Sequence, residues 1–307
     1  MERVAIVGLG LIGGSLGLAL KSSVPGVEVI GVARREETAS TAVSIRAADR
    51  AGTDLALIRD ADLVVLACPL AATAQVLVET MPHLGEGARV TDVGSVKGPV
   101  VKHALSILDQ ERNPFLGGHP MAGKEVTGIV HAEPELFRGR PWILTPGHGW
   151  FTSAAGAVRE ERGGPGGYVP EGWQDYATAL RGFGALPVFM PPARHDRYVA
   201  MISHLPFLLS AAYLVATGGQ SDWAEASELA SSGFRDFTRV GGGDPGMYSA
   251  IAGMNRDEML RAWAALHEAM DMFEAAMARG EEAALLELFT TAQATRRAWL
   301  ERQAEGN

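Results

Sequence analysis

The fold of this protein is decided near its N-terminus by the stretch Val4-Ala5-Ile6-Val7-Gly8-Leu9-Gly10-Leu11-Ile12-Gly13. A short run of apolar and β-branched residues is typical of a strand buried on both faces, as in a parallel sheet. Here the run leads directly into a glycine-rich turn, residues 15–21 are compatible with a helix, and residues 27–32 form a second apolar run. Strand, glycine loop, helix and strand in this order are the context that a dinucleotide-binding fingerprint requires.

Each glycine of this loop has a distinct predicted role. Gly8 permits the tight turn, Gly10 lets the backbone approach a pyrophosphate, and Gly13 lets helix and strand pack closely. Leu11 and Ile12 lie between these glycines, and the helix that follows has N-terminal N–H groups that attract phosphates. We predict that these five residues bind a dinucleotide. The alternative is a tight turn that binds no ligand.

The end of the second strand indicates which dinucleotide is bound. An NAD site usually has Asp or Glu there, which binds the ribose 2′-hydroxyl. This chain has Ala33 at that place, followed by Arg34 and Arg35, and guanidinium groups are suited to a 2′-phosphate. The sequence therefore favours NADP. The alternative is NAD, with Glu36 or Glu37 binding the ribose and both arginines solvated.

Further apolar runs alternate with helical segments along the chain. Strands are predicted at residues 63–67, 88–93, 113–117 and 141–145. This alternation predicts an α/β domain of Rossmann type, with a doubly wound, mostly parallel sheet and helices on both faces. Because ligands bind at the carboxyl ends of such strands, Cys68 and Pro69, which follow the third run, are also predicted to bind the cofactor.

Two domains are predicted from the change in composition along the chain. Residues 1–190 form the dinucleotide-binding domain, with a glycine-rich insertion near 147–172 that we interpret as a surface loop rather than a lid. Residues 191–307 carry Ala, Leu, Met and Trp at helical spacing and form an all-helical domain. We expect this domain to bind substrate and to form a homodimer. The alternative is a helical core packed only within one subunit.

Composition excludes several classes of protein. A single cysteine, Cys68, leaves no disulfide framework or cysteine-based zinc site, and no HExxH pair is present, so no metal is expected. A net charge of −9 and a pI near 5.4 argue against nucleic acid as a partner. No uninterrupted stretch of 18 or more apolar residues occurs in the sequence, so we expect no membrane span and predict a cytoplasmic location.

Several motifs in a fixed order indicate a family. They are Gly8-Leu9-Gly10-Leu11-Ile12-Gly13-Gly14-Ser15, Asp92-Val93-Gly94-Ser95-Val96-Lys97, Gly117-Gly118-His119-Pro120-Met121-Ala122-Gly123-Lys124-Glu125, His195-Asp196, Ser203-His204-Leu205-Pro206 and Gly233-Phe234-Arg235-Asp236-Phe237-Thr238-Arg239. With them the chain resembles the prephenate/arogenate dehydrogenase family of tyrosine biosynthesis. The resemblance spans residues 1 to about 257.

The resemblance implies an oxidative decarboxylation. Hydride leaves the hydroxyl-bearing carbon of a cyclohexadiene for the nicotinamide of NAD(P), the hydroxyl loses its proton, and CO2 departs as the ring becomes aromatic. The implied substrate is prephenate, and the alternatives are arogenate or both compounds. A different two-domain reductase acting on hydroxyacids or imines would typically need a catalytic lysine on a helix or lack the motif around His119. A dinucleotide sensor without activity would have no reason to combine Ser95, His119 and Arg239.

The resemblance also implies the roles of single residues. His119 is the catalytic base, with a pKa expected near the ordinary 6.5. Ser95 carries a hydroxyl that bonds to this histidine and to the substrate, unless it only caps the following helix. Arg239 binds a substrate carboxylate, unless it is held in an internal salt bridge with Asp236 or Asp244.

Other positions near the substrate follow from the same motifs. His204, Arg235, Glu125 and Lys124 are predicted to line the substrate site. The chain departs from the pattern His-Leu-Pro-His of many members, because Phe207 replaces the second histidine. That histidine is thought to contact the substrate, so its loss leaves the choice between prephenate and arogenate open.

Overall fold

The computed structural model describes residues 1–124, 126–147 and 169–305. The chain forms two compact units, Met1–Arg256 and Asp257–Asn307. This division follows packing alone, so the domain boundary that we predict at residue 190 stays a prediction. Most of the glycine-rich insertion lies outside the described residues, as does Glu125.

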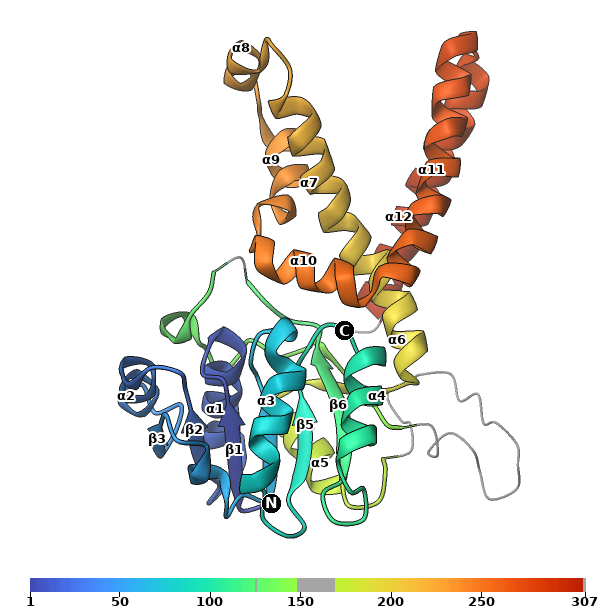
Figure 1. The fold of residues 1–307 in the computed structure, drawn as a ribbon. Coiled ribbons are helices and arrows are strands. Elements are labelled where there is room, and N and C mark those ends of the chain that lie inside the picture. The colour runs from blue at the N-terminus through green and yellow to red at the C-terminus, as the bar shows by residue number, and fades with distance from the viewer. Residues whose placement is uncertain (125, 148–168, 306–307) are drawn as a thin grey trace, which may run out of the picture. The chain divides into compact units, whose positions relative to one another are not determined.

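The first unit is built on an eight-stranded sheet in the order β3-β2-β1-β4-β5-β6-β7-β8 (Figure 1). All neighbouring strands are parallel except β6 and β7, which are antiparallel. The strands are β1 (Arg3–Val7), β2 (Glu28–Val32), β3 (Arg50–Gly52), β4 (Leu63–Leu66), β5 (Arg89–Asp92), β6 (Phe115–Pro120), β7 (Pro141–Thr145) and β8 (Leu186–Phe189). The predicted fold class, a Rossmann-type and mostly parallel sheet, is confirmed.

Helices cover both faces of this sheet. Helices α3 (Thr73–Thr80) and α4 (Gly98–Ile107) pack together on one face, and α1 (Leu11–Ser23) and α5 (Gln174–Gly182) pack together on the other (Figure 1). Helix α2 (Glu36–Ser44) contacts β3 at the edge. Strands β1 and β4 are almost fully buried between these layers, which explains their continuous apolar sequence.

Sequence reasoning missed two strands, both short. Strand β3 has only three residues, all half-buried, and Arg50 is charged. Strand β8 has four residues and contains Pro187, which normally argues against a strand but is tolerated at a sheet edge. Both strands lie at the two edges of the sheet, where apolar periodicity is weakest.

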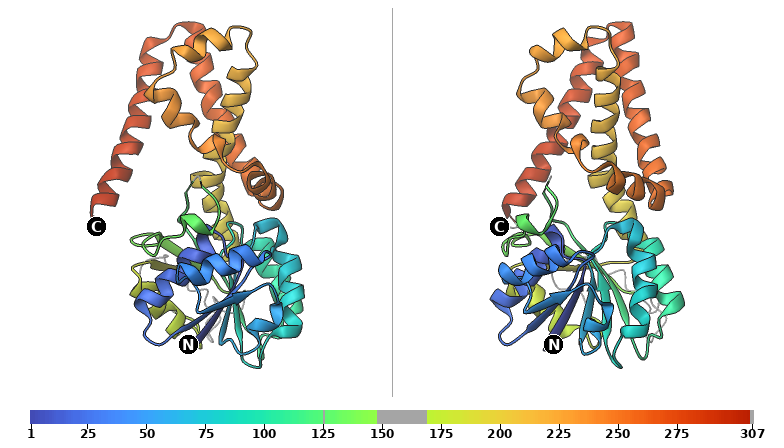
Figure 2. Two further views of the ribbon diagram at one scale, coloured as in Figure 1. Left: turned by 90° about the vertical axis from the view of Figure 1, so that its left-hand side faces the viewer. Right: turned by 60° about the vertical axis from the view of Figure 1, so that its left-hand side comes forward.

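The remainder of the first unit is helical. It comprises α6 (Pro192–Val199), the π-helical turn η6 (Ala200–His204), α7 (Leu205–Gly218), α8 (Trp223–Glu228), α9 (Ser232–Thr238), the short turn η7 (Val240–Gly242) and α10 (Pro245–Met254). The second unit is a helical hairpin of α11 (Arg256–Arg279) and α12 (Glu282–Glu305), seen from two further sides in Figure 2. Gly280 makes the turn with a φ of +66°, and Phe273 contacts Phe289 across the hairpin at 5.3 Å between ring centroids.

One helical run bears on the expectation that the chain has no membrane span. Within the described residues, the helical run Pro192–Gly218 is 27 residues long, with a mean hydropathy of 1.8, and by length and composition is apolar enough to cross a membrane. Only 28% of its apolar window is buried within the chain. Length and composition alone are weak grounds for a membrane span, because core and interface helices of globular proteins meet the same criterion.

Candidate active site

The glycine loop after β1 has the shape of a phosphate cradle. A Cβ atom on Gly8, whose φ is +108°, would lie 2.5 Å from the Ala67 carbonyl oxygen, and one on Gly13 would lie 2.0 Å from the Gly8 carbonyl oxygen. Gly10 has no atom within 4 Å of its Cβ position. Two glycines are therefore required by packing, and the third leaves open space where α1 begins. These residues fit a dinucleotide pyrophosphate at the helix N-terminus.

The residues after β2 present arginine side chains where many dinucleotide sites have an acidic residue for the ribose. Arg34 and Arg35 are exposed, whereas Ala33 is buried. The Glu36 carboxylate accepts a hydrogen bond from the Thr53 hydroxyl at 2.8 Å. The acidic group nearest the strand end is thus already engaged, and the two guanidinium groups face solvent.

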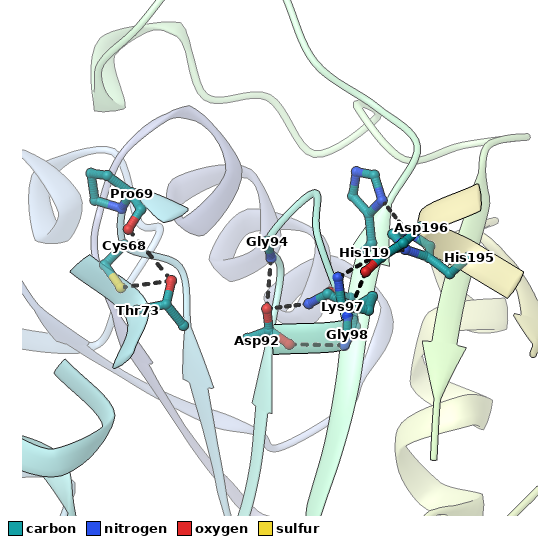
Figure 3. A network of polar contacts seen from close by, with 11 residues as sticks. Cys68, Pro69, Thr73, Asp92, Gly94, Lys97, Gly98, His119, His195 and Asp196 are labelled. Atoms are coloured by element: carbon teal, nitrogen blue, oxygen red, sulfur yellow. Dashed lines mark hydrogen bonds and ion pairs between the residues drawn. The ribbon is translucent and has the colours of Figure 1, made fainter. Parts of the chain in front are cut away.

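The end of β4 borders the same region. The Cys68 thiol lies 3.8 Å from the Thr73 hydroxyl, which donates to the Pro69 carbonyl oxygen at 3.4 Å (Figure 3). Burial raises the pKa of the Cys68 thiol, and the positive charge of Arg34 opposes that rise. Arg34 and Cys68 therefore lie near each other, although they follow different strands.

Three hydrogen-bonded side chains, those of His119, His195 and Asp196, lie beside the proposed cofactor-binding ends of the strands, and we call them the histidine chain. His119 Nδ1, from β6, is 2.8 Å from His195 Nε2, from α6, and His195 Nδ1 is 2.7 Å from Asp196 Oδ1 (Figure 3). Asp196 Oδ1 also accepts from the Lys97 backbone N–H, and Oδ2 accepts from the Gly98 N–H, both at 2.7 Å. Asp196 thus caps α4 and anchors the histidines. All three side chains are buried.

The hydrogen bonds of Asp196 determine the tautomers along this chain. An ionised carboxylate can only accept, so His195 carries its proton on Nδ1 and leaves Nε2 as an acceptor. His119 must then donate from Nδ1 to His195 Nε2. The lone pair on His119 Nε2 therefore takes no part in the hydrogen bonds among these three side chains. The arrangement presents one histidine nitrogen as a base, with its orientation set by two partners behind it. Its order is that of the serine-protease triad, in which a carboxylate orients a histidine.

A buried ion pair supports the end of strand β6, which carries His119. The Lys97 ammonium contacts Asp92 and donates to the Gly118 carbonyl oxygen at 2.8 Å. Asp92 accepts from the backbone N–H groups of Gly94 at 2.9 Å and Gly118 at 3.1 Å. Both charged side chains are fully buried. Because a buried charge is tolerated only when paired and hydrogen-bonded, this pair ties the ends of β5 and β6 together.

The environment keeps His119 neutral. Burial, and then the neighbouring His195, Lys97 and His204, lower the pKa of His119 well below its usual 6.5. Burial also lowers the pKa of His195, although Asp196 opposes the shift. The expectation of an ordinary pKa for His119 is therefore wrong, because the sequence does not show its burial. The lone pair of His119 is therefore unprotonated at pH 7, and the lowered pKa also makes the ring a weaker proton acceptor than an imidazole whose pKa is near the working pH.

Comparison with known proteins now adds to this geometry. Residues 16–160 match the family described as "Prephenate dehydrogenase, nucleotide-binding domain", and residues 191–291 match "Prephenate dehydrogenase, dimerization domain". The solved arogenate dehydrogenase of Synechocystis is 33% identical, with a TM-score of 0.78, and the match covers 97% of this chain and 100% of that one. The chain belongs to the prephenate dehydrogenase family.

Two further members of the family are similar over most of this chain. Prephenate dehydrogenase from Bacillus subtilis is 33% identical over 263 residues, 84% of this chain and 66% of the relative. The structure of prephenate dehydrogenase from Aquifex aeolicus in complex with hydroxyphenyl propionate and NAD+ has a TM-score of 0.84 at 26% identity, covering 97% and 98% of the two chains. This chain spans slightly less than two thirds of the curated relatives from B. subtilis and Lactococcus lactis, 66% and 64%.

The structure places the other residues predicted from the family in three settings. Ser95 is half-buried in the loop between β5 and α4, and its hydroxyl makes no hydrogen bond with the residues that the structure describes. Lys124 forms an ion pair with Glu133 at 2.6 Å. Arg235 and Arg239 are exposed on and next to α9. Their predicted roles stay predictions.

His204 lies close to the histidine chain. It is buried, and Asn255 Nδ2 is 3.1 Å from its Nδ1. Burial lowers the pKa of His204 to about 4. Phe207, which replaces the second histidine of the family pattern, stacks on Tyr248 with ring centroids 4.0 Å apart and 7° between the planes. An apolar stack therefore stands where many members have a polar group.

Sequence reasoning did not select several residues of this site. His195 and Asp196 stand in a quoted motif but were given no role, and Asp92 and Lys97 belong to another. Asn255 lies in no motif at all. Their positions in these motifs could have indicated the first four residues as part of the site. No nearby sequence pattern distinguishes Asn255 from other asparagines.

The lowered histidine pKa values predict that stability falls with acid. Between pH 6.5 and about 4 the unfolded chain protonates His204 and the folded protein does not. Above pH 6.5, His204 is neutral in both states and does not lower the unfolding free energy. As the pH falls to 4, protonation of His204 in the unfolded chain alone lowers the unfolding free energy by up to about 3 kcal/mol. Urea denaturation at about pH 7 and about pH 4.5 measures the difference. His204→Gln should show a clearly smaller difference, and an equal one would contradict the prediction.

Proposed function

We propose that this chain is an NAD(P)-dependent dehydrogenase that converts prephenate to 4-hydroxyphenylpyruvate by oxidative decarboxylation. The observation that carries the proposal is the neutral, oriented base His119 at the carboxyl edge of the sheet that also bears the phosphate cradle. An NAD+ complex of an A. aeolicus relative at 26% identity supports a nicotinamide cofactor. Gly8, Gly10, Gly13 and the first residues of α1, Leu11 and Ile12, would hold its pyrophosphate.

The residues supply what the reaction needs. A nicotinamide cofactor, when bound at this edge of the sheet, would supply the hydride acceptor. His119 Nε2 takes the hydroxyl proton as the carbon–oxygen double bond forms, and the positive charge that develops on the histidines is stabilised by Asp196. The bond to the ring carboxylate then breaks, and its electron pair makes the ring aromatic and the ring oxygen a phenolate, which takes up a proton. In this proposal Ser95 and His204 bind the substrate beside the base, with Arg239, Arg235, Glu125 and Lys124 as further candidates.

Arogenate is the second candidate substrate, because the Synechocystis arogenate dehydrogenase is 33% identical and Phe207 leaves no histidine at the second motif position. The test incubates the protein with prephenate or arogenate, each with NAD or NADP, and follows nicotinamide reduction by absorbance. Reduction with one substrate identifies it. No reduction in any of the four mixtures would refute the proposed activity.

A homodimer through the helical region is part of the proposal. Residues 191–291 match a dimerization domain. Large apolar side chains are exposed on the helices of both units: Met201, Ile202, Val215, Leu260, Leu286 and Phe289. Exposed apolar area of this extent is typical of surfaces that are covered by a partner, and a second copy is the partner that the family description favours.

We propose NADP as the preferred cofactor, bound through Arg34 and Arg35. Arg34→Ala should raise the Kd for NADP by about 10- to 100-fold, since a charge-assisted bond to a phosphate is lost, and should change the Kd for NAD less than about twofold. Fluorescence titration of each cofactor measures this. Arg59→Ala, which removes an exposed arginine at the opposite end of the strands, is the matched control. Equal weakening of both cofactors by Arg34→Ala would refute the preference.

A further inference from the structure

Asn255 links three parts of the first unit from a buried position. It follows α10 directly and is 4% exposed. Its side-chain nitrogen Nδ2 lies 2.9 Å from the backbone carbonyl oxygen of Asp196 and 3.1 Å from His204 Nδ1. One amide group therefore connects the carboxylate end of the histidine chain to the histidine of η6.

The partners of Asn255 determine which way its amide points. The carbonyl oxygen of Asp196 can only accept, so the atom of Asn255 that faces it must be the nitrogen. If the amide were reversed, two oxygen atoms would lie 2.9 Å apart without a proton between them. The orientation of the amide is thus set by a backbone group that cannot change its protonation.

This orientation in turn determines the tautomer of His204. The Asn255 nitrogen carries two hydrogens, one for Asp196 and one for His204 Nδ1. His204 Nδ1 must then accept, so the neutral ring carries its proton on Nε2. The low pKa of His204, about 4, keeps the ring neutral at pH 7.

His204 Nε2 is a buried donor without an acceptor among the residues that the structure describes. Buried polar groups nearly always have a partner, and an unpaired one is commonly satisfied by a ligand or water. His204 also lies close enough to His119 and His195 for their charges to interact. The unpaired donor is therefore part of the same buried cluster as the proposed base.

We propose that Asn255 is a positioning residue that holds His204 in the Nε2–H form and so presents a hydrogen-bond donor to an oxygen atom of the substrate. The identity of the ligand rests on the proposed function, whereas the tautomer does not. Asn255 touches no reacting atom in this proposal and acts through His204.

The first test reads the tautomer directly. Long-range ¹H–¹⁵N NMR of protein labelled at histidine distinguishes the two neutral forms and the cation, and the His204 signals are those lost in His204→Gln. We expect the Nε2–H form at pH 7 in the unmodified protein. The Nδ1–H form or a cation there would overturn the proposal, without any need for substrate or for a variant at Asn255.

The second test uses variants at Asn255. Asn255→Asp replaces the donor with an acceptor, so His204 should change to the Nδ1–H form or the cation, and the KM for the substrate should rise about tenfold or more. The KM for the cofactor should change less than about twofold. Asn255→Ser keeps one hydrogen-bond donor, so its substrate KM should lie between those of the unmodified protein and of Asn255→Asp. It also provides the test if the aspartate variant does not fold.

Asn113→Ala is the matched control. Asn113 is also buried and also donates twice from Nδ2, to the carbonyl oxygens of Gly85 and Ala88 at 2.9 Å each. It should lower stability and leave both the His204 signals and the substrate KM unchanged. If the Asn255 variants resemble this control in both readouts, Asn255 has only a structural role and the proposal is wrong. If none of the four substrate and cofactor mixtures reacts, the proposed function fails while the tautomer result stands by itself.

Discussion

Replacing His119 with alanine is expected to lower kcat by about 10²- to 10⁴-fold, the usual contribution of a positioned general base. The hydrogen bonds through His195 to Asp196 leave His119 Nε2 as the unprotonated nitrogen of the chain. Its lowered pKa means that almost every molecule has the base form at pH 7. Removing the imidazole therefore removes the proton acceptor itself and leaves only binding and orientation.

Cofactor affinity separates this effect from unfolding. The His119→Ala protein should bind the dinucleotide with an unchanged Kd, because the phosphate cradle lies on β1 and α1. His131→Ala, which removes an exposed histidine, should keep normal kcat. A His119→Ala enzyme with a kcat within a few-fold of the unmodified protein would exclude His119 as the base.

Replacing Asp196 with alanine is expected to have the second large effect, on both stability and turnover. Three N–H groups lose their acceptor: those of Lys97, Gly98 and His195. Two of them are backbone donors at the start of α4, and each buried donor left unpaired costs about 1–3 kcal/mol. His195 is also released to take either tautomer, so we expect kcat to fall by about 10²-fold or more.

Asp196→Asn separates charge from geometry. Its amide oxygen still accepts from Lys97 and His195 at the Oδ1 position, and only the Gly98 bond is lost. The histidine tautomers are then kept, but the negative charge that stabilises the protonated histidines is absent. We therefore expect a smaller loss of unfolding free energy than in the alanine variant. The fall in kcat of Asp196→Asn measures the effect of removing the negative charge while the histidine tautomers are kept.

Asp62→Ala provides the control, because the Asp62 carboxylate also accepts from two consecutive backbone N–H groups, those of Glu2 and Arg3, at the amino ends of the inner strands β1 and β4. Urea denaturation and kcat are measured for the three variants. Asp62→Ala should lose stability and keep turnover. Equal kcat values for Asp196→Ala and Asp62→Ala would contradict the role assigned to Asp196.

Local sequence accounts for the part of the protein built from neighbours along the chain. The strand, glycine loop and helix of residues 3–23 are recognisable because each glycine has a steric reason within a few residues. The six inner strands are recognisable because burial on both faces favours apolar runs. The edge strands β3 and β8 carry no such run, and they were missed.

The chemistry of the candidate site could be predicted only in part. The sequence by itself determined the Rossmann-type fold, the family and the position of His119, because these depend on local patterns and on motif order. Only the tertiary structure decided that His119 has a lowered pKa, that His195 and Asp196 stand behind it, and that Asn255 faces His204. His119 and His195 are 76 residues apart in the sequence, and Asn255 and His204 are 51 apart. Their contacts therefore cannot be predicted from a local sequence pattern. A histidine's tautomer and pKa are set by which groups lie within hydrogen-bond distance and how much water is excluded, and both arise only when distant segments pack together.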